Sequence, residues 1–89
     1  MSNLDERTIY HCYATNSVDY SGALPGIDVT DEYGEPVCST HRPPGWAGGG
    51  GFDPPLLDAE LELLGFRRLG PWEVGIAHAH TLAKAATDL

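Results

Sequence analysis

Basic residues are scarce in this chain, which has 5 Lys and Arg against 13 Asp and Glu and a formal net charge of −8. A protein this acidic repels phosphate backbones, so direct nucleic-acid binding is disfavoured, whereas a basic protein surface would attract it. Long apolar runs are also missing, and none approaches the roughly 18 residues that a bilayer-spanning helix needs. Residues 1–6 carry neither the basic nor the apolar stretch of a secretory signal. We therefore expect a cytoplasmic protein without membrane contact.

Cysteine is rare as well, with Cys12 and Cys38 as the two instances. In a reducing cell both are expected to remain thiols, and a cross-strand disulfide between them is the alternative. The 89 residues make a single domain, 1–89, near the lower size limit for folding without a metal, a disulfide or a partner. The hydrophobic core is therefore expected to be thin.

The first element is predicted to be a strand over residues 7–15, which are rich in aromatic and β-branched side chains. Side chains alternate between the two faces of a strand. This places His11 and Tyr13 on one face, and Tyr10 and Cys12 on the other.

A β-hairpin is predicted next, because residues 27–30 and 36–40 are β-branched runs that flank the turn residues 31–35. Proline has no N–H to donate to a sheet, so Pro36 indicates that its strand begins there or lies at an edge. The Pro/Gly-rich segment 42–51, with four consecutive glycines, is predicted to be a flexible loop.

Residues 54–64 carry the clearest helix pattern. Asp53 can cap this helix, Pro54 fits its first position, and Gly65 is placed to end it. Acidic residues occupy the polar side. If the apolar stripe exceeds what the neighbouring strands can cover, a homodimer is the natural remedy. The stripe is formed by leucines at helical spacing, namely Leu57, Leu61 and Leu64, widened by Leu56 and Leu63.

The last third is predicted to hold a second hairpin, from residues 66–69 and 72–76 around a Gly-Pro turn. Its residues Trp72, Val74 and Ile76 are expected to pack on the leucines. From His78 onward, Ala, Leu and Lys favour a final helix. The predicted fold is α+β, with antiparallel hairpins packed on one or two helices in the order β-β-β-α-β-β-α.

The acidic residues concentrate in the middle of the chain, where exposed aromatic candidates accompany them. Aromatic side chains are frequent anchors of protein interfaces, and carboxylates favour a basic partner. The alternative is that the acidity serves solubility alone. We expect a non-enzymatic protein-binding module, such as an inhibitor that docks on a basic surface, with these partner-binding residues: Asp28, Asp31, Glu32, Tyr33, Glu35 and Trp46.

A small zinc-stabilised domain is the main alternative, because Cys38 and His41 have the spacing of half a zinc site and Cys12 offers a third ligand. The fourth would be one of His11, His78 and His80. A third class is a small enzyme with Cys38 or Ser39 as nucleophile and His41 as base, but no orienting group is evident. We therefore expect no enzymatic activity and no cofactor besides the alternative zinc.

One resemblance adds context. The run from Gly65 to Glu73, after a leucine-rich acidic helix, is similar to a pattern in short uncharacterised proteins of actinobacteria and their phages. The piece from Gly34 to His41, with its Val-Cys-x-x-His sequence, is similar to segments of the same proteins. The resemblance implies a small accessory protein, in which binding and inhibiting a host protein is a common role, and it transfers no functional residue.

Overall fold

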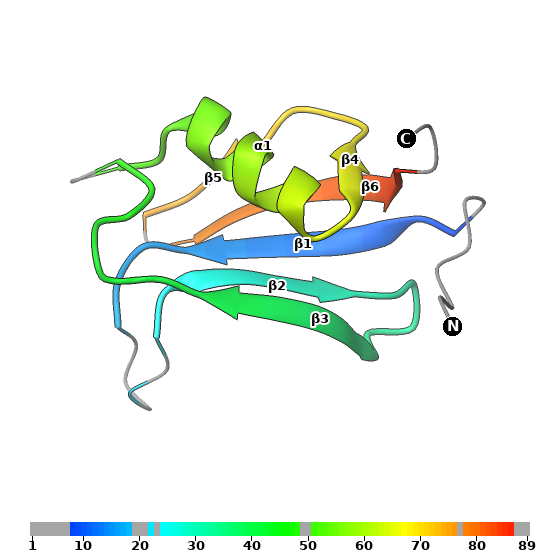
Figure 1. Ribbon diagram of the computed structural model, residues 1–89, viewed down its shortest axis with the longest axis horizontal. Helices are drawn as coiled ribbons and strands as arrows, with labels where there is room; N and C mark the ends of the chain where they lie inside the picture. Colours follow the sequence, from blue (N-terminus) through cyan, green and yellow to red (C-terminus); the bar gives the residue numbers. More distant parts are fainter. Residues whose placement is uncertain (1–7, 19–21, 23, 49–50, 77, 87–89) are drawn as a thin grey trace.

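The computed structural model describes residues 8–18, 22, 24–48, 51–76 and 78–86. Their fold is a single antiparallel β-sheet with one helix packed on one of its faces (Figure 1). The strands follow the spatial order β3-β2-β1-β6-β4, and β5 also pairs with β6. The elements in chain order are β1 (Tyr10–Thr15), β2 (Gly26–Thr30), β3 (Pro36–His41), α1 (Pro54–Leu63), β4 (Phe66–Arg68), β5 (Glu73–Val74) and β6 (His78–Ala85).

The three strands described in the first half of the chain lie where the sequence predicts strands. β1 buries Tyr10, Cys12 and Ala14, so the predicted alternation between its two faces is confirmed. The hairpin of β2 and β3 is also confirmed, and β3 starts at Pro36 and forms one edge of the sheet. At its other end, Gly26 has a φ of 151°, and a Cβ there would lie 1.8 Å from the carbonyl oxygen of Thr40. Glycine is therefore needed where β2 begins beside β3.

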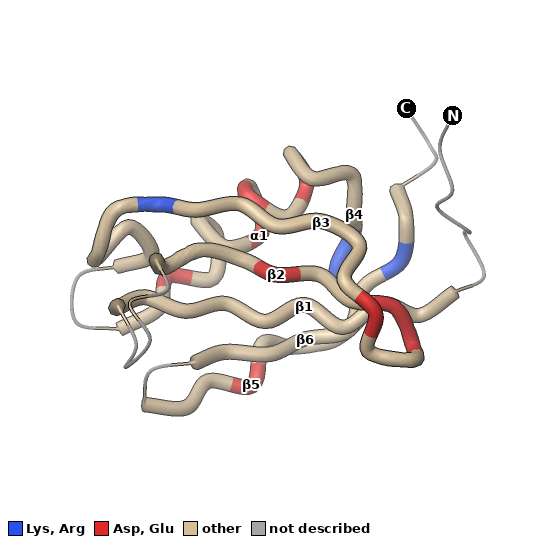
Figure 2. Tube along the Cα trace, turned by 90° about the horizontal axis from the view of Figure 1, so that it is seen from below, with Lys and Arg blue, Asp and Glu red and all other residues tan. Residues whose placement is uncertain are grey.

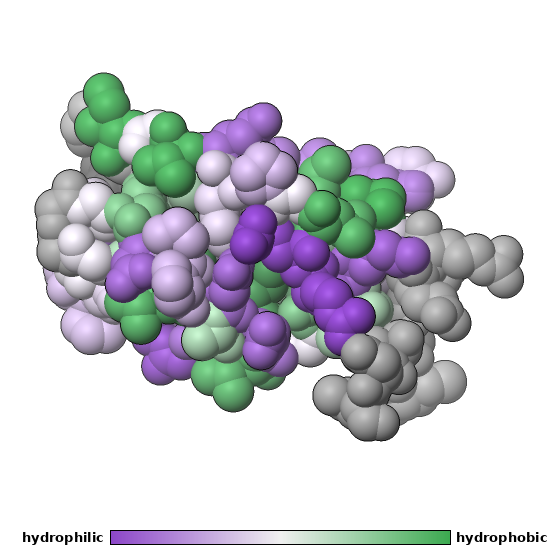
Figure 3. Space-filling view, turned by 90° about the horizontal axis from the view of Figure 1, so that it is seen from above, coloured by the Kyte–Doolittle hydropathy of each residue, from purple (hydrophilic) through white to green (hydrophobic). Residues whose placement is uncertain are grey.

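Helix α1 begins after Asp53 and is followed by Gly65, which has a positive φ of 96°, as the sequence predicts. Asp53 stands at the N-cap position, but its side chain makes no capping hydrogen bond. Leu57 and Leu61 are fully buried against the sheet. Leu56 and Leu63 are exposed, so the predicted widening of the stripe is wrong. The sheet covers Leu57 and Leu61 but not Leu56 and Leu63, so the homodimer stays a prediction. Figure 3 shows the molecule from the side on which α1 lies, and the apolar patches on that side are separated by polar side chains.

The last third differs from the prediction, because the final helix is a strand. β6 spans His78–Ala85 and lies in the sheet between β1 and β4. Its burial alternates from residue to residue, with Ala79, Thr81, Ala83 and Ala85 inside. Pairing with β1 along residues 78–83 overrides the helix propensity of Ala, Leu and Lys.

The predicted second hairpin is also wrong. β4 and β5 do not pair with each other: both pair with β6, β4 at residues 83–85 and β5 at residues 79–80. Val74 and Ile76 are exposed, whereas Trp72 is partly buried and packs against the core. The observed order β-β-β-α-β-β-β therefore makes the fold mostly β, with one helix among the described residues.

The core lies between α1 and the covered face of the sheet. Phe66 from β4 contacts Tyr10 from β1 edge to face, with ring centroids 5.0 Å apart. Leu57, Leu61, Ile27 and other buried apolar side chains complete the cluster. In the described part of the chain, no helix has the length and apolar character needed to cross a membrane.

Candidate functional site

No described helix or strand covers the face of the sheet opposite α1 (Figure 2). All four histidines of the chain lie on this face. Strand alternation and register place His11, His41, His78 and His80 on this open face, in β1, β3 and β6. His78, Thr15, Gly26 and His41 form one row across four strands. The neighbouring row crosses five strands and consists of Glu73, His80, Tyr13, Asp28 and Ser39.

His11 and His80 are in direct contact within this face. Nδ1 of His11 lies 3.0 Å from Nε2 of His80, so one ring donates a hydrogen bond and the other accepts it. Tyr13 packs against both rings, with centroids 5.0 Å from His80 and 6.1 Å from His11. The second nitrogen of His80, Nδ1, lies 3.9 Å from a carboxylate oxygen of Glu73. We call His11, Tyr13, Glu73 and His80 the histidine cluster.

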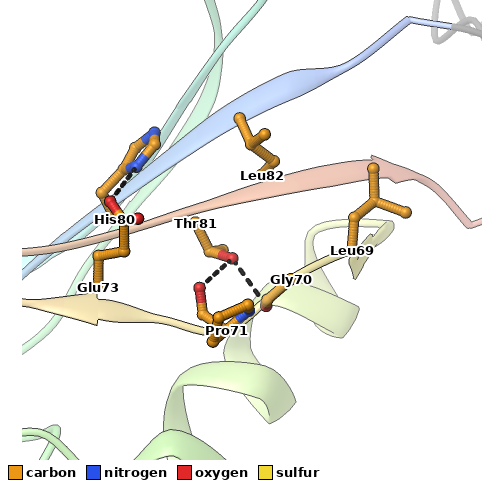
Figure 4. A pocket seen from close by; sticks show the side chains of 7 residues that line it. All are labelled: Leu69, Gly70, Pro71, Glu73, His80, Thr81 and Leu82. Atoms are coloured by element: carbon orange, nitrogen blue, oxygen red, sulfur yellow. Dashed lines mark hydrogen bonds and ion pairs between the residues drawn. The ribbon is translucent and has the colours of Figure 1, made fainter.

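A shallow pocket of about 230 Å³ adjoins this cluster, where β4 ends and β5 begins. Figure 4 shows His80, Leu82 and Leu69 on one side of the sheet, and Thr81 directed to the other side. There the Thr81 hydroxyl lies within hydrogen-bonding distance, 3.0 and 3.1 Å, of the carbonyl oxygens of Gly70 and Pro71. This contact holds the 69–72 segment beside β6 and leaves His80 and Glu73 at the pocket's rim.

The turn between β2 and β3 gathers four of the six predicted partner-binding residues. The Asp31 carboxylate accepts hydrogen bonds from the backbone N–H groups of Tyr33 and Glu35, at 2.8 and 2.9 Å, so its role in this structure is to hold the turn. The Tyr33 side chain at the tip is 84% exposed. Glu32 and Glu35 are exposed too, and no ion pair engages them among the described residues. Figure 2 shows these acids together at one end of the sheet.

The acidic residues of α1 are placed differently, because two of them are paired. Glu60 is buried and accepts hydrogen bonds from the Arg42 guanidinium, one of them 3.0 Å long from Nε. Asp58 accepts hydrogen bonds from Arg68, at 2.8 and 3.1 Å, and from the Trp72 indole, at 2.8 Å. Partial burial alone would raise the pKa of Asp58, but these donors outweigh it and hold that pKa below its usual value.

Trp46 is separated from the acidic turn, contrary to the single binding surface that the sequence predicts. Its indole N–H donates a 3.0 Å hydrogen bond to the carbonyl oxygen of Thr15, at the opposite end of β1 from the turn. Trp46 is half-buried and packs against the core, and its neighbour Ala47 is fully buried. Its indole therefore closes the end of the sheet. Asp28, the sixth predicted residue, is exposed on the open face.

The predicted zinc ligands do not converge. Cys38 and His41 are three residues apart in β3, so they point to opposite faces of the sheet. The same geometry removes the Cys38–His41 enzyme hypothesis. Ser39 and His41 share the open face, but no hydrogen bond joins them as a dyad in the described part of the chain. Among the described residues, no group of three or more His, Cys, Asp and Glu side chains is arranged to hold a metal.

The two cysteines are free and share the covered face, but β2 lies between their strands. Cys12 and Cys38 pair with Val29 of β2 from its two sides, so they are separated by two strand spacings. Their backbones are therefore about 9–10 Å apart, which is beyond the reach of a disulfide. Burial, with a smaller contribution from Cys38, raises the pKa of Cys12 to about 12. Burial also raises the pKa of Cys38. Both are therefore protonated near neutral pH, which disfavours metal binding and nucleophilic attack.

The histidine cluster was missed by the sequence-based prediction, because β6 was assigned to a helix. The relevant pattern is the alternation of His78, His80, Leu82 and Lys84 with small residues, which is typical of a strand with one buried face. No protein-family model matches the chain, and no curated protein or solved structure shows significant similarity to it.

Proposed function

We propose that the chain is a non-enzymatic protein-binding module, which docks the β2–β3 turn on a basic surface of a partner protein. The observation that carries this proposal is the exposed Tyr33 between Glu32 and Glu35, whose charges no described basic side chain neutralises. Arg42 and Arg68 are paired with Glu60 and Asp58 of α1, on the covered side of the sheet.

The turn is preorganised for such a contact. The two hydrogen bonds to the Asp31 carboxylate and the backbone bond from Asp31 N–H to the Glu35 carbonyl fix its conformation before any partner arrives. A surface that is already ordered loses less conformational entropy on binding. Tyrosine is among the residues that contribute most to interface energies, and the flanking carboxylates orient a basic partner and speed its association.

The biological setting that we propose is an accessory or inhibitory protein acting in the cytoplasm. The free thiols of Cys12 and Cys38 are compatible with a reducing compartment. The resemblance to short actinobacterial and phage proteins supports an accessory role. An inhibitor of this type would place Glu32 and Glu35 where the partner's basic surface otherwise meets a phosphate backbone.

The experiment that tests this proposal is an NMR titration of the ¹⁵N-labelled protein with a short, unstructured peptide rich in Lys and Arg. We expect the largest chemical-shift changes at residues 31–35, with weaker binding as salt is added, because exposed charges are screened. Shift changes spread evenly over every acidic segment, including α1, would contradict a dedicated docking turn.

Charge-reversal variants with a matched control sharpen the result. Glu32→Lys and Glu35→Lys should each weaken peptide binding by about two- to five-fold, in line with exposed charge pairs. Glu62→Lys changes the net charge equally on the exposed side of α1 and should have a smaller effect. Tyr33→Ser tests the aromatic anchor without a change of charge. Equal weakening by Glu62→Lys would show that net charge alone drives the association.

A further inference from the structure

The histidine cluster has no role in the proposed partner binding, although His11 pairs with Thr30 at the end of β2, next to the acidic turn. Two imidazole nitrogens lie 3.0 Å apart on the open face, contributed by His11 in β1 and His80 in β6. These residues are 69 positions apart in the chain, so only the folded sheet brings them together. Neutral imidazole is the most common metal ligand among protein side chains and suits zinc, copper and nickel.

We propose that His11 and His80 form a two-histidine site for a divalent transition-metal ion such as Ni²⁺, Cu²⁺ or Zn²⁺, with Glu73 orienting His80. In the metal-bound form, Nδ1 of His11 and Nε2 of His80 coordinate the ion in place of their mutual hydrogen bond. Water completes the coordination sphere, since the two imidazoles are the protein ligands and no third ligand joins them among the described residues.

The distance between the two nitrogens fits this chemistry. At a metal–nitrogen distance of about 2.0–2.1 Å, two nitrogens 3.0 Å apart subtend about 94° at the ion. This is close to the right angle between neighbouring positions of square-planar or octahedral sites, so Ni²⁺ and Cu²⁺ fit with little change in spacing. Both lone pairs must turn toward the ion, which requires rotation about χ2, a torsion that is broad in histidine.

The surroundings of His80 resemble the outer shell of a metal site. A metal-bound histidine usually donates its other ring N–H to a carboxylate or carbonyl, which fixes the tautomer and the ring orientation. His80 has Glu73 at 3.9 Å from Nδ1, the nitrogen that faces away from His11. The ion itself would lie on the opposite side of His80, between its Nε2 and Nδ1 of His11 on the open face, where solvent supplies the water ligands.

The test is calorimetric titration of the full-length, tag-free protein with Ni²⁺, repeated with Zn²⁺. We expect one ion per chain. His11→Ala and His80→Ala should each weaken binding by at least about tenfold, because each removes half of a chelating pair. His41→Ala and His78→Ala are matched controls on the same open face, and they should leave the affinity unchanged within about twofold. Glu73→Gln should weaken it by about tenfold or less, as expected for an exposed outer-shell carboxylate.

Three results would overturn the proposal: absence of binding, binding that survives both His11→Ala and His80→Ala, or equal loss in His41→Ala or His78→Ala. The far-ultraviolet circular dichroism of each variant shows whether it is folded. The absorption spectrum of the Co²⁺ complex provides a second readout, because thiolate coordination adds an intense charge-transfer band. That band would place the ion on Cys12 or Cys38 and likewise reject the two-histidine site.

Discussion

The two faces of the sheet use the same strands for different purposes. On the covered face, over which α1 lies (Figure 1), β1 buries Tyr10, Cys12 and Ala14 in one cluster with Leu57 and Leu61. On the open face, the same strand presents His11 and Tyr13 to the histidine cluster. The buried contacts that stabilise the fold are concentrated on the covered face, so the open face is free to carry polar and aromatic side chains whose geometry is set by their strands.

The acidic residues show the same division. Asp58 and Glu60 on α1 are held by Arg68 and Arg42, and these links tie the helix to the sheet and to the segment after β3. Glu32 and Glu35 have no such partner among the described residues, although they lie in a turn that is itself well held. Asp58 and Glu60 are therefore structural, whereas Glu32 and Glu35 are exposed, as the proposed recognition requires.

The largest expected effect contrasts two leucines on opposite sides of the sheet. Leu57 of α1 is fully buried between the helix and the sheet, and Leu82 is 38% exposed on the open face. Leu57→Ala should lower the free energy of unfolding by about 2–5 kcal/mol, because it removes buried contacts and leaves a cavity. Leu82→Ala should cost less than about 1 kcal/mol, because its side chain already meets water. Urea denaturation followed by circular dichroism measures both.

Equal losses of unfolding free energy in Leu57→Ala and Leu82→Ala would contradict the difference between the two faces of the sheet. They would mean that the open face is covered in solution, for example by a second copy of the chain. Analytical ultracentrifugation of the unmodified protein at several concentrations would separate that case from a direct structural role of Leu82 in the monomer.

A smaller effect is expected at the Arg42–Glu60 pair. The Glu60 side chain is 10% exposed and the Arg42 side chain 40%, so the carboxylate is the buried partner. Arg42→Ala should lower the free energy of unfolding by about 1–3 kcal/mol, because it leaves Glu60 buried without its donor. Glu62→Gln, an exposed position on the same helix, is the matched control and should stay within about 0.5 kcal/mol. Thermal unfolding at fixed pH compares the two variants. Similar decreases in Tm for Arg42→Ala and Glu62→Gln would contradict a structural role for the Arg42–Glu60 pair.

Elements with a strong local pattern could be predicted from the sequence, namely β1, the β2–β3 hairpin and α1 with Asp53 and Gly65 at its ends. β6 could not, because Ala, Leu and Lys favour a helix locally and its pairing with β1 joins residues far apart in the chain. Because β6 was predicted to be a helix, the predicted order of elements and the predicted pairing of β4 with β5 were wrong as well.

The candidate site was predictable to the same extent. The acidic turn depends on adjacent residues, so Glu32, Tyr33 and Glu35 were found together. The contact of His11 with His80 depends on the β1–β6 register, and it was missed. Trp46 was misplaced because composition does not show that its indole finds the Thr15 carbonyl.

The smallest expected effect is the pH dependence that Asp58 contributes. Hydrogen bonds from Arg68 and Trp72 lower its pKa in the folded protein, so its contribution to stability is full above the unfolded-state pKa of about 3.9 and is lost as the pH falls through the lower folded-state value. Because the pair is partly exposed, this contribution should be below about 1 kcal/mol. Asp58→Asn should therefore be less stable than the unmodified protein at neutral pH, and the difference should shrink as the pH falls below about 4. Urea unfolding of both proteins across this range measures it, and a difference that stays constant with pH would show that the Asp58 charge contributes nothing to its link with β4.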